Sequence, residues 1–272
     1  LVKQADFPFT PEHDRMSAEA VDGVLAAPKP ARRLGAILEF LDPTERNGIA
    51  SRLQKWVNRG ELAWLFDNPE DTLEVDDCCI VGFDVTEFLE NDDTRTPTMM
   101  YLMHRIETLF DGRRVPIFMD EFSRLLDDEA FSDFGKNKLV TIRKQDGFLV
   151  MFLQDPQQAL NSKIAFAIIN QTAVKIFLPN PTASYEAYVE GFGCTVREWE
   201  IIRSLGEKSR QFLIKTGHNS VVAQLNLRGF DDELAVLSGN TATSRLAEDL
   251  VAKLGPDPAV WLPEFHRIRK GE

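Results

Sequence analysis

Short apolar runs separated by helical patterns constrain the fold of this chain more than any other feature. The runs occupy residues 79–83, 115–119, 148–153, 173–178, 211–215 and 220–227. Helical patterns of about ten or more residues separate the first four runs, as at 97–110, 131–145 and 157–170. Apolar strands that alternate with helices predict an α/β fold with a mostly parallel sheet covered on both faces. The last two runs, joined by Thr216-Gly217-His218-Asn219, predict an antiparallel hairpin.

The first 75 residues have a different, helical pattern. Residues 32–41 and 48–57 carry apolar positions at three- and four-residue spacing, with prolines between and around them. A further helical pattern lies at 241–254. The chain therefore begins with a helical segment and continues as alternating strands and helices.

Composition excludes several classes of protein. Forty-three acidic residues against 31 basic ones give a net charge of −12, which argues against a chain built to coat DNA or anionic lipid. Cys78, Cys79 and Cys194 form no CxxC pair and no disulfide framework, which indicates a reducing compartment. No apolar run approaches the length of a membrane span. Because the chain starts at Leu1 without a signal-peptide pattern, we expect it to be an internal piece of a longer protein.

The strongest local signal is a buried apolar run, residues 115–119, that ends in Asp120 and Glu121. Ligands of open α/β sheets bind at the carboxyl ends of the strands. In P-loop ATPases the first acid of such a pair holds Mg²⁺, often through water, and the second polarises the attacking water. The alternative is that both acids simply begin a solvated helix, where negative charge suits the helix dipole.

Four further residues, at three places in the chain, each have a possible catalytic role and an ordinary structural explanation. Gln154 follows the next strand and could sense a γ-phosphate, although Gln-Asp-Pro is also a common turn. Arg143 and Lys144 precede that strand, and we expect Arg143 near the nucleotide edge as an arginine finger. A basic pair that closes a helix is more often only favourable to the helix dipole. Arg210, at the start of a later strand, has the same two interpretations.

A phosphate-binding P-loop is missing from the sequence. That motif needs G-x-x-x-x-G-K-[ST], and the one Gly-Lys pair, Gly135-Lys136, is followed by Asn137 and has no upstream glycine at the required position. We therefore expect these 272 residues alone to be inactive as an ATPase.

Several short segments together carry a family resemblance. In chain order they are Arg59-Gly60-Glu61, 65–68 (LFDN), 82–86 (GFDVT), 101–107 (YLMHRIE), Asp120-Glu121, 142–144 (IRK), 177–181 (FLPNP), 209–215 (SRQFLIK) and 237–239 (LSG). In this order, and along nearly the whole chain, they resemble the C-terminal ATPase domain of the CagE/TrbE/VirB family, the conjugal-transfer ATPases of type IV secretion systems.

This resemblance implies a RecA-like P-loop NTPase fold. Residues 1–75 would be part of a helical insertion and 76–272 the ATPase core, without the P-loop strand and helix, which the family places upstream. Asp120 would bind Mg²⁺ through water, Glu121 would activate water and Gln154 would sense the nucleotide. Arg143, Lys144 and Arg210 would lie near ATP or at a subunit boundary.

The resemblance also implies a cellular role. The family works as a hexamer at the cytoplasmic face of the bacterial inner membrane, where ATP hydrolysis powers pilus biogenesis and transfer of protein or DNA. Its partners are other secretion components, including partner ATPases and inner-membrane subunits, while a nucleic-acid partner is left open. Two alternatives stay open: a non-catalytic docking module of the secretion machine, and a DNA translocase of the FtsK/HerA type.

Overall fold

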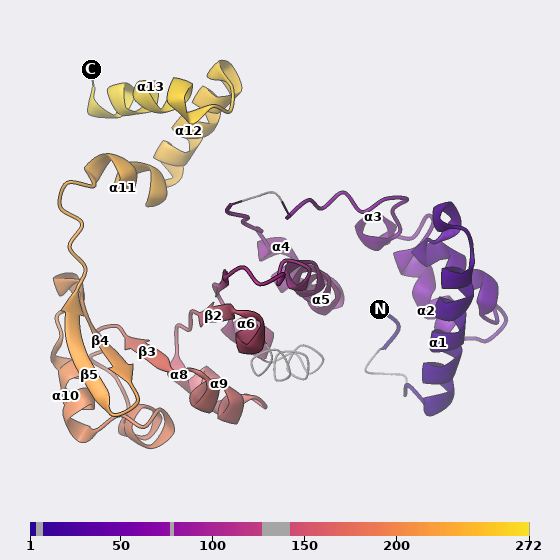
Figure 1. The fold of residues 1–272 in the computed structure, drawn as a ribbon, viewed down its shortest axis with the longest axis horizontal. Coiled ribbons are helices and arrows are strands. Elements are labelled where there is room, and N and C mark those ends of the chain that lie inside the picture. Colours follow the sequence, from indigo (N-terminus) through magenta and orange to yellow (C-terminus); the bar gives the residue numbers. More distant parts are fainter. Residues whose placement is uncertain (4–7, 77–78, 127–141, 272) are drawn as a thin grey trace. The chain divides into compact units, whose positions relative to one another are not determined.

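The computed structural model describes residues 1–3, 8–76, 79–126 and 142–271. The chain divides into two compact units, Leu1–Gln171 and Thr172–Glu272. Figure 1 shows the course of the chain and labels its elements. This division follows Gln171, so the boundary at residue 75 between a helical insertion and an ATPase core stays a prediction. Within the described ranges, no helix combines the length and apolar character that a membrane crossing requires.

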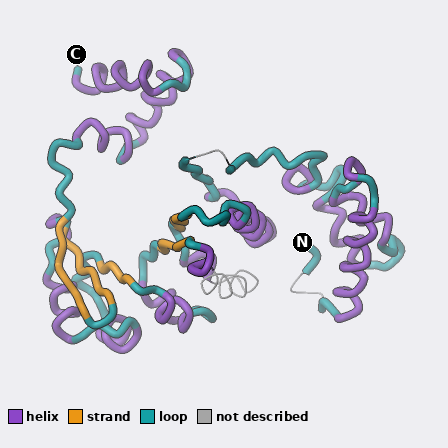
Figure 2. The backbone as a smooth tube through the Cα atoms, in the orientation of Figure 1, coloured by secondary structure: helices purple, strands orange, loops and turns teal. Residues whose placement is uncertain are grey.

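The first unit begins with helices. Its elements before the first strand are α1 (Pro11–Ala26), η1 (Lys29–Ala31), η2 (Leu34–Phe40), α2 (Ile49–Leu53), η3 (Gln54–Trp56), α3 (Ala63–Phe66), α4 (Thr86–Glu90) and α5 (Asp92–Glu107). The helical pattern at 32–41 forms 3₁₀ turns rather than an α-helix. A buried cluster that includes Ala20, Leu53 and Trp56 joins α1, η2, α2, η3 and α3 into one core. Figure 2 shows the described residues up to 76 as helices and loops only.

Asp67 ties the segments of this helical region together. Its side chain is only 2% exposed. Its two carboxylate oxygens accept hydrogen bonds from the backbone N–H groups of Gly35 at 2.8 Å and Asn58 at 2.7 Å. Arg33 donates to the Asp67 carbonyl oxygen at 2.7 Å. A charged acceptor that satisfies two backbone donors is one of the stronger hydrogen-bonding arrangements in proteins. Asp67 therefore fixes three chain segments that are distant in sequence.

A second acidic anchor fastens the loop after α3 to helix α5. Asp71 accepts a hydrogen bond from the Tyr101 hydroxyl at 2.6 Å and pairs with the Arg105 guanidinium at 2.7 Å. Arg105 also donates to the Leu73 carbonyl at 2.7 Å. Burial and the bond to Asp71 raise the pKa of Tyr101 to about 12, while the same bond lowers the pKa of Asp71. Tyr101 therefore stays a neutral donor at any physiological pH.

The strand part of the first unit is a parallel pair. Its elements are β1 (Val115–Met119), α6 (Ser123–Leu126), η4 (Ile142–Gln145), β2 (Gly147–Met151), α8 (Pro156–Asn161) and α9 (Ala165–Gln171). β1 and β2 run parallel, with Val115 opposite Gly147 and Met119 opposite Met151. Both strands were expected from the sequence and are confirmed. Most of the expected helix at 131–145 lies outside the described residues.

The second unit is built on an antiparallel sheet of three strands. Its elements are β3 (Val174–Phe177), the π-helix η5 (Glu186–Gly191), α10 (Val196–Ser204), η6 (Glu207–Ser209), β4 (Gln211–Thr216), β5 (Asn219–Gln224), α11 (Asp231–Leu237), α12 (Thr241–Leu254) and α13 (Pro258–Lys270). β4 lies between β3 and β5. The expected hairpin is confirmed, and Gly217 has the positive φ, 59°, that its tight turn requires.

Two expectations about the strands are wrong. Residues 79–83 form no strand: Ile80 is 91% exposed, and in the described part of the chain no strand pairs with this segment. A strand needs a partner for its backbone groups, whatever its side-chain pattern. The run at 173–178 does form β3, but it pairs antiparallel with β4. Side-chain periodicity does not encode strand direction. The mixed α/β class with a parallel sheet is nevertheless confirmed.

A buried ion pair joins helix α10 to the sheet of the second unit. Lys215 Nζ lies 2.8 Å from Glu198 Oε2, and the two side chains are 10% and 5% exposed. Glu198 also accepts a hydrogen bond from the Thr195 N–H as part of the α10 capping box. Burial raises the pKa of Glu198, but the bonds from Lys215 and Thr195 outweigh burial, so the net shift is downward.

Replacing Asp67 with Ala should destabilise the helical region. Two backbone donors would lose their acceptor in a buried position, at about 1–3 kcal/mol for each unsatisfied group, so we expect a loss of roughly 2–6 kcal/mol. Hydrogen exchange at the Gly35 and Asn58 amides would measure the loss directly. Asp22→Ala, an exposed position on α1, is the matched control and should change stability by less than about 0.5 kcal/mol. Equal protection in Asp67→Ala and wild type would contradict the anchor.

The Glu198–Lys215 pair predicts a pH dependence for the second unit. Because the pKa of folded Glu198 lies below the ordinary 4.5, its stabilisation is fully present above that pH and is lost as the pH falls through the folded value. Glu198→Gln should cost about 3 kcal/mol at pH 7, since it leaves a buried lysine unpaired. The gap to wild type should narrow as the pH falls below 4.5 and through the pKa of folded Glu198. Denaturant unfolding at pH 7 and pH 3, with Glu200→Gln on the same helix as control, checks both statements.

Candidate functional site

The carboxyl ends of β1 and β2 are held together beyond the last paired residues. Phe152 N–H donates to the Met119 carbonyl at 3.0 Å, and Phe122 N–H donates to the Phe152 carbonyl at 3.3 Å. Phe122 is only 1% exposed, so it anchors the segment that follows β1. These contacts bring Asp120 and Glu121 to the same sheet edge as Gln154, as the sequence predicts for adjacent parallel strands.

The acidic pair forms a tight turn between β1 and α6. Glu121 has a φ of 49°, in the left-handed region that few residues other than glycine adopt. Asp120 Oδ1 accepts the Glu121 N–H at 2.9 Å, which fixes this conformation. The Glu121 carbonyl accepts the Arg124 N–H at 3.0 Å, and its carboxylate lies 2.9 Å from Arg124 Nε. The turn is therefore closed by both backbone and side-chain contacts.

Gln154 and Asp155 follow β2 at the same edge. Gln154 is exposed, and Asp155 caps helix α8 by accepting the Gln157 N–H at 2.9 Å. Asp120 is also exposed. The carboxylates of Asp120 and Asp155 and the amide of Gln154 are therefore open to solvent at this edge. Such groups can bind a hydrated cation, orient water and form hydrogen bonds with a phosphate oxygen.

Arg143 and Lys144 lie at the other end of β2. Both belong to η4, which ends two residues before Gly147, the first residue of the strand. β2 rises by about 3.3 Å at each residue, so its length alone separates this end from Gln154 by roughly 13 Å. Because η4 leads into the amino end of the strand, Arg143 lies away from the acidic edge of its own subunit, and its expected role as an arginine finger stays a prediction. The Arg143 side chain lies outside the described part, and Lys144 is exposed.

Arg210 belongs to the second unit and has an unusual backbone. Its φ of 57° is left-handed, and its carbonyl accepts the Leu225 N–H at 3.0 Å. The preceding Ser209 accepts two hydrogen bonds, at its carbonyl from Gln224 Nε2 and at its hydroxyl from Gln211 N–H. A non-glycine residue held in this conformation by surrounding bonds often marks a functional site. The Arg210 side chain is exposed.

No group of three His, Cys, Asp or Glu side chains with metal-binding geometry occurs among the described residues. A Mg²⁺ ion does not require one, because it keeps several waters and uses one or two carboxylates together with substrate phosphates. Asp120 fits this role: one of its oxygens accepts the Glu121 N–H, and its exposed carboxylate has a second oxygen for a hydrated cation.

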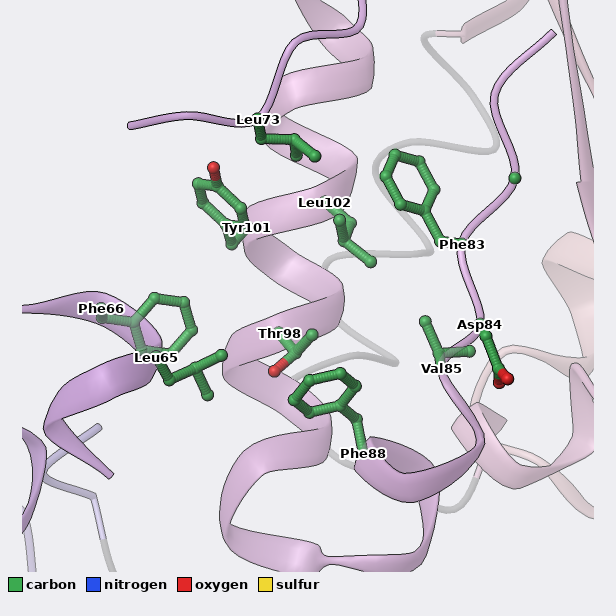
Figure 3. Close-up of a pocket in the computed structure, with 11 residues that line it drawn as sticks. Leu65, Phe66, Leu73, Phe83, Asp84, Val85, Phe88, Thr98, Tyr101 and Leu102 are labelled. Atoms are coloured by element: carbon green, nitrogen blue, oxygen red, sulfur yellow. The ribbon is translucent and has the colours of Figure 1, made fainter. Parts of the chain in front are cut away.

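A hollow of the first unit lies along α5, away from the acidic edge. It is an apolar pocket of about 300 Å³ in which Leu102 of α5 faces Phe83 and Val85, while Tyr101 lies on the side of Phe66 (Figure 3). The buried Thr98 hydroxyl beside it has no hydrogen-bond partner among the described residues. Three segments of the family resemblance, at 65–68, 82–86 and 101–107, thus contribute to one hydrophobic feature.

Comparison with known proteins gives consistent results. No family model matches the chain. It is 47% identical over 256 residues to the type IV secretion system protein VirB4 of Bartonella quintana, covering 94% of this chain and 32% of that protein. It is 45% identical to VirB4 of Brucella suis, over 96% of this chain and 33% of that protein, and 40% identical to PtlC of Bordetella pertussis, over 99% and 34%. Over this length the chain belongs to the VirB4 family of type IV secretion proteins.

A solved structure supports the fold. The VirB4 structure of Thermoanaerobacter pseudethanolicus matches with a TM-score of 0.62 and 15% sequence identity, over 80% of this chain and 64% of that chain. The family resemblance and the P-loop-ATPase-like α/β fold expected from the sequence are thereby confirmed. The chain spans about a third of the length of the VirB4 and PtlC relatives.

One residue of the site was not expected from the sequence. Arg124 contacts Glu121 directly, and the signal for it was its three-residue spacing from Glu121 just after a strand. The i,i+3 positions of a helical turn are neighbours, so an acid and a base at that spacing pair readily.

Proposed function

We propose that this chain forms the water-activating part of a type IV secretion ATPase. The observation that carries the proposal is the arrangement of Asp120, Glu121 and Gln154 at the ends of two adjacent parallel strands. In the complete assembly, hydrolysis of ATP would power pilus biogenesis and the transfer of protein or DNA across the bacterial envelope.

Each residue of the edge has a distinct role in this proposal. Asp120 holds Mg²⁺ through water, and the ion neutralises phosphate charge when it is bound. Glu121 orients the attacking water and accepts its proton. Gln154 forms a hydrogen bond with the γ-phosphate and reports its presence. All three act from the carboxyl edge of the sheet, the place where α/β folds bind ligands.

The phosphate-binding part of the site is absent from these 272 residues. P-loop amides and a lysine supply most phosphate contacts in such enzymes. We propose that the site is complete only with a P-loop, in a protein that extends to the length of its relatives. Residues 1–75 then belong to a helical insertion and 76–272 to the RecA-like core. The active form is a hexamer at the cytoplasmic face of the inner membrane, in contact with partner ATPases and inner-membrane subunits.

A second candidate is a docking module without catalysis. The observation in its favour is the missing P-loop, since a chain that never acquires a phosphate cradle would hold ATP poorly. Such a module would bind other secretion components through its surface and leave Asp120 and Glu121 as ordinary solvated acids.

Glu121→Gln separates the two candidates. In a chain extended to the full length of its relatives, the amide keeps the size of the side chain but cannot accept a proton, so ATP binding should persist while turnover falls at least about 100-fold. Phosphate release at saturating Mg·ATP measures turnover, and binding of a fluorescent ATP analogue measures affinity. Glu107→Gln, at the end of α5, is a control of the same chemistry. Turnover close to wild type in Glu121→Gln would reject the ATPase assignment of this edge.

The trans arginine is expected to be Arg210 rather than Arg143. Arg210 is exposed on a backbone held in place by its neighbours, and Arg143, which precedes the amino end of β2, is the alternative for action on a neighbouring subunit. An arginine that stabilises transition-state charge contributes about 10³–10⁵ in rate. Arg210→Ala should therefore abolish hydrolysis without unfolding the protein.

Mixing variants tests whether that arginine acts between subunits. Rings assembled from Arg210→Ala and Glu121→Gln subunits should regain activity at interfaces where an intact Glu121 meets an intact Arg210. The same mixture with Arg143→Ala in place of Arg210→Ala is the comparison. Rescue in the Arg143 mixture alone would reverse the assignment, and no rescue in either mixture, with mixed rings shown to form, would exclude a trans arginine at both positions.

A further inference from the structure

We infer that Arg124 is a positioning residue for Glu121 in ATP hydrolysis. The inference rests on the proposed function, because it gives Arg124 a role only if Glu121 activates water. Its observation is the contact between Arg124 Nε and Glu121 Oε2 at 2.9 Å across the turn that follows β1.

The contact belongs to a turn whose backbone is already fixed. Asp120 Oδ1 holds the Glu121 N–H, and the Arg124 N–H closes the turn on the Glu121 carbonyl. Phe122, between them, is buried and bonded to Phe152 of the neighbouring strand end. The main chain therefore presents both Glu121 and Arg124 in a defined direction, and the remaining freedom lies in the Glu121 side chain.

Arg124 restricts that remaining freedom. A glutamate side chain has three rotatable bonds, and an exposed one samples many rotamers. The guanidinium occupies Oε2, so Oε1 is left to accept a hydrogen bond from water. Among the described residues, the carboxylate that forms an ion pair with Arg124 is that of Glu121. Arg124 thereby selects one orientation of the general base and leaves its working oxygen free.

Stability alone does not account for this pair. Both side chains are more than 40% exposed, and exposed pairs at i,i+3 contribute little to folding. The pair lies on the residue that the proposed mechanism uses, in a left-handed turn that glycine would adopt more easily. A geometry that fixes a general base matters for rate, since a displacement of about 1 Å can cost a factor of about 100.

The test compares variants of a chain extended to the full length of its relatives. Arg124→Ala should lower kcat for ATP by about 10- to 100-fold and leave KM within about twofold. Arg124→Lys should recover part of the rate, because the ammonium restores the charge but not the fixed fork of donors. Arg114→Ala is the control. Arg114 is an exposed arginine that directly precedes β1, at the amino end of the strand, and its Nε lies 3.6 Å from Asp146 Oδ1. It should have wild-type kinetics.

Combining the variant with Glu121→Gln shows whether Arg124 acts through Glu121. If it does, Arg124→Ala should cause no further loss of single-turnover rate in the Glu121→Gln background. A further loss there, or a KM that rises more than tenfold, would mean that Arg124 contacts the nucleotide itself and would overturn the inference. Wild-type kcat in Arg124→Ala would also overturn it, while Glu121→Gln still tests the proposed function independently.

Discussion

The parallel pairing of β1 with β2 is the constraint on which the candidate site depends. The two strands are aligned in register over their whole length, and the hydrogen bonds continue past it through Phe152 and Phe122. Because parallel strands end at the same edge, the polar residues after each strand must meet there. A shift of β2 by one residue relative to β1 would turn its inward-facing side chains outward, and it would separate Glu121 from Gln154. The site is therefore a consequence of register rather than of any single side chain.

Three acidic residues fasten segments in other parts of the structure. Asp67 accepts two backbone hydrogen bonds in the helical region, Asp71 fastens a loop to α5 through Tyr101, and Glu198 pairs with buried Lys215. These residues lie in or directly contact segments that carry the family resemblance. Such segments therefore include residues with an architectural role, and the presence of a segment alone does not identify catalytic residues.

The sequence predicted those parts of the fold that depend on local pattern. The strands at 115–119 and 148–153 and the hairpin around Gly217 formed where apolar periodicity and turn residues placed them. Residues 79–83 have the same apolar pattern but no strand beside them in the described part, so they form no strand, and Ile80 is exposed. The direction of β3 and the distance of Arg143 from the acidic edge depend on tertiary pairing, which periodicity does not contain. The meeting of Asp120, Glu121 and Gln154 was predictable because it needs only two adjacent parallel strands.

The exposure of the acidic edge bears on how such a site would be controlled. Asp120 and Gln154 are open to solvent, and Glu121 is held by a pair that is itself more than 40% exposed. Electrostatic stabilisation of a phosphoryl transition state is strong only where water is excluded. The described residues supply a rigid frame for the reacting groups but do not enclose them. In the proposed ATPase, enclosure would come from phosphate-binding groups and from arginines supplied by assembly, and hydrolysis would then depend on the joining of these parts.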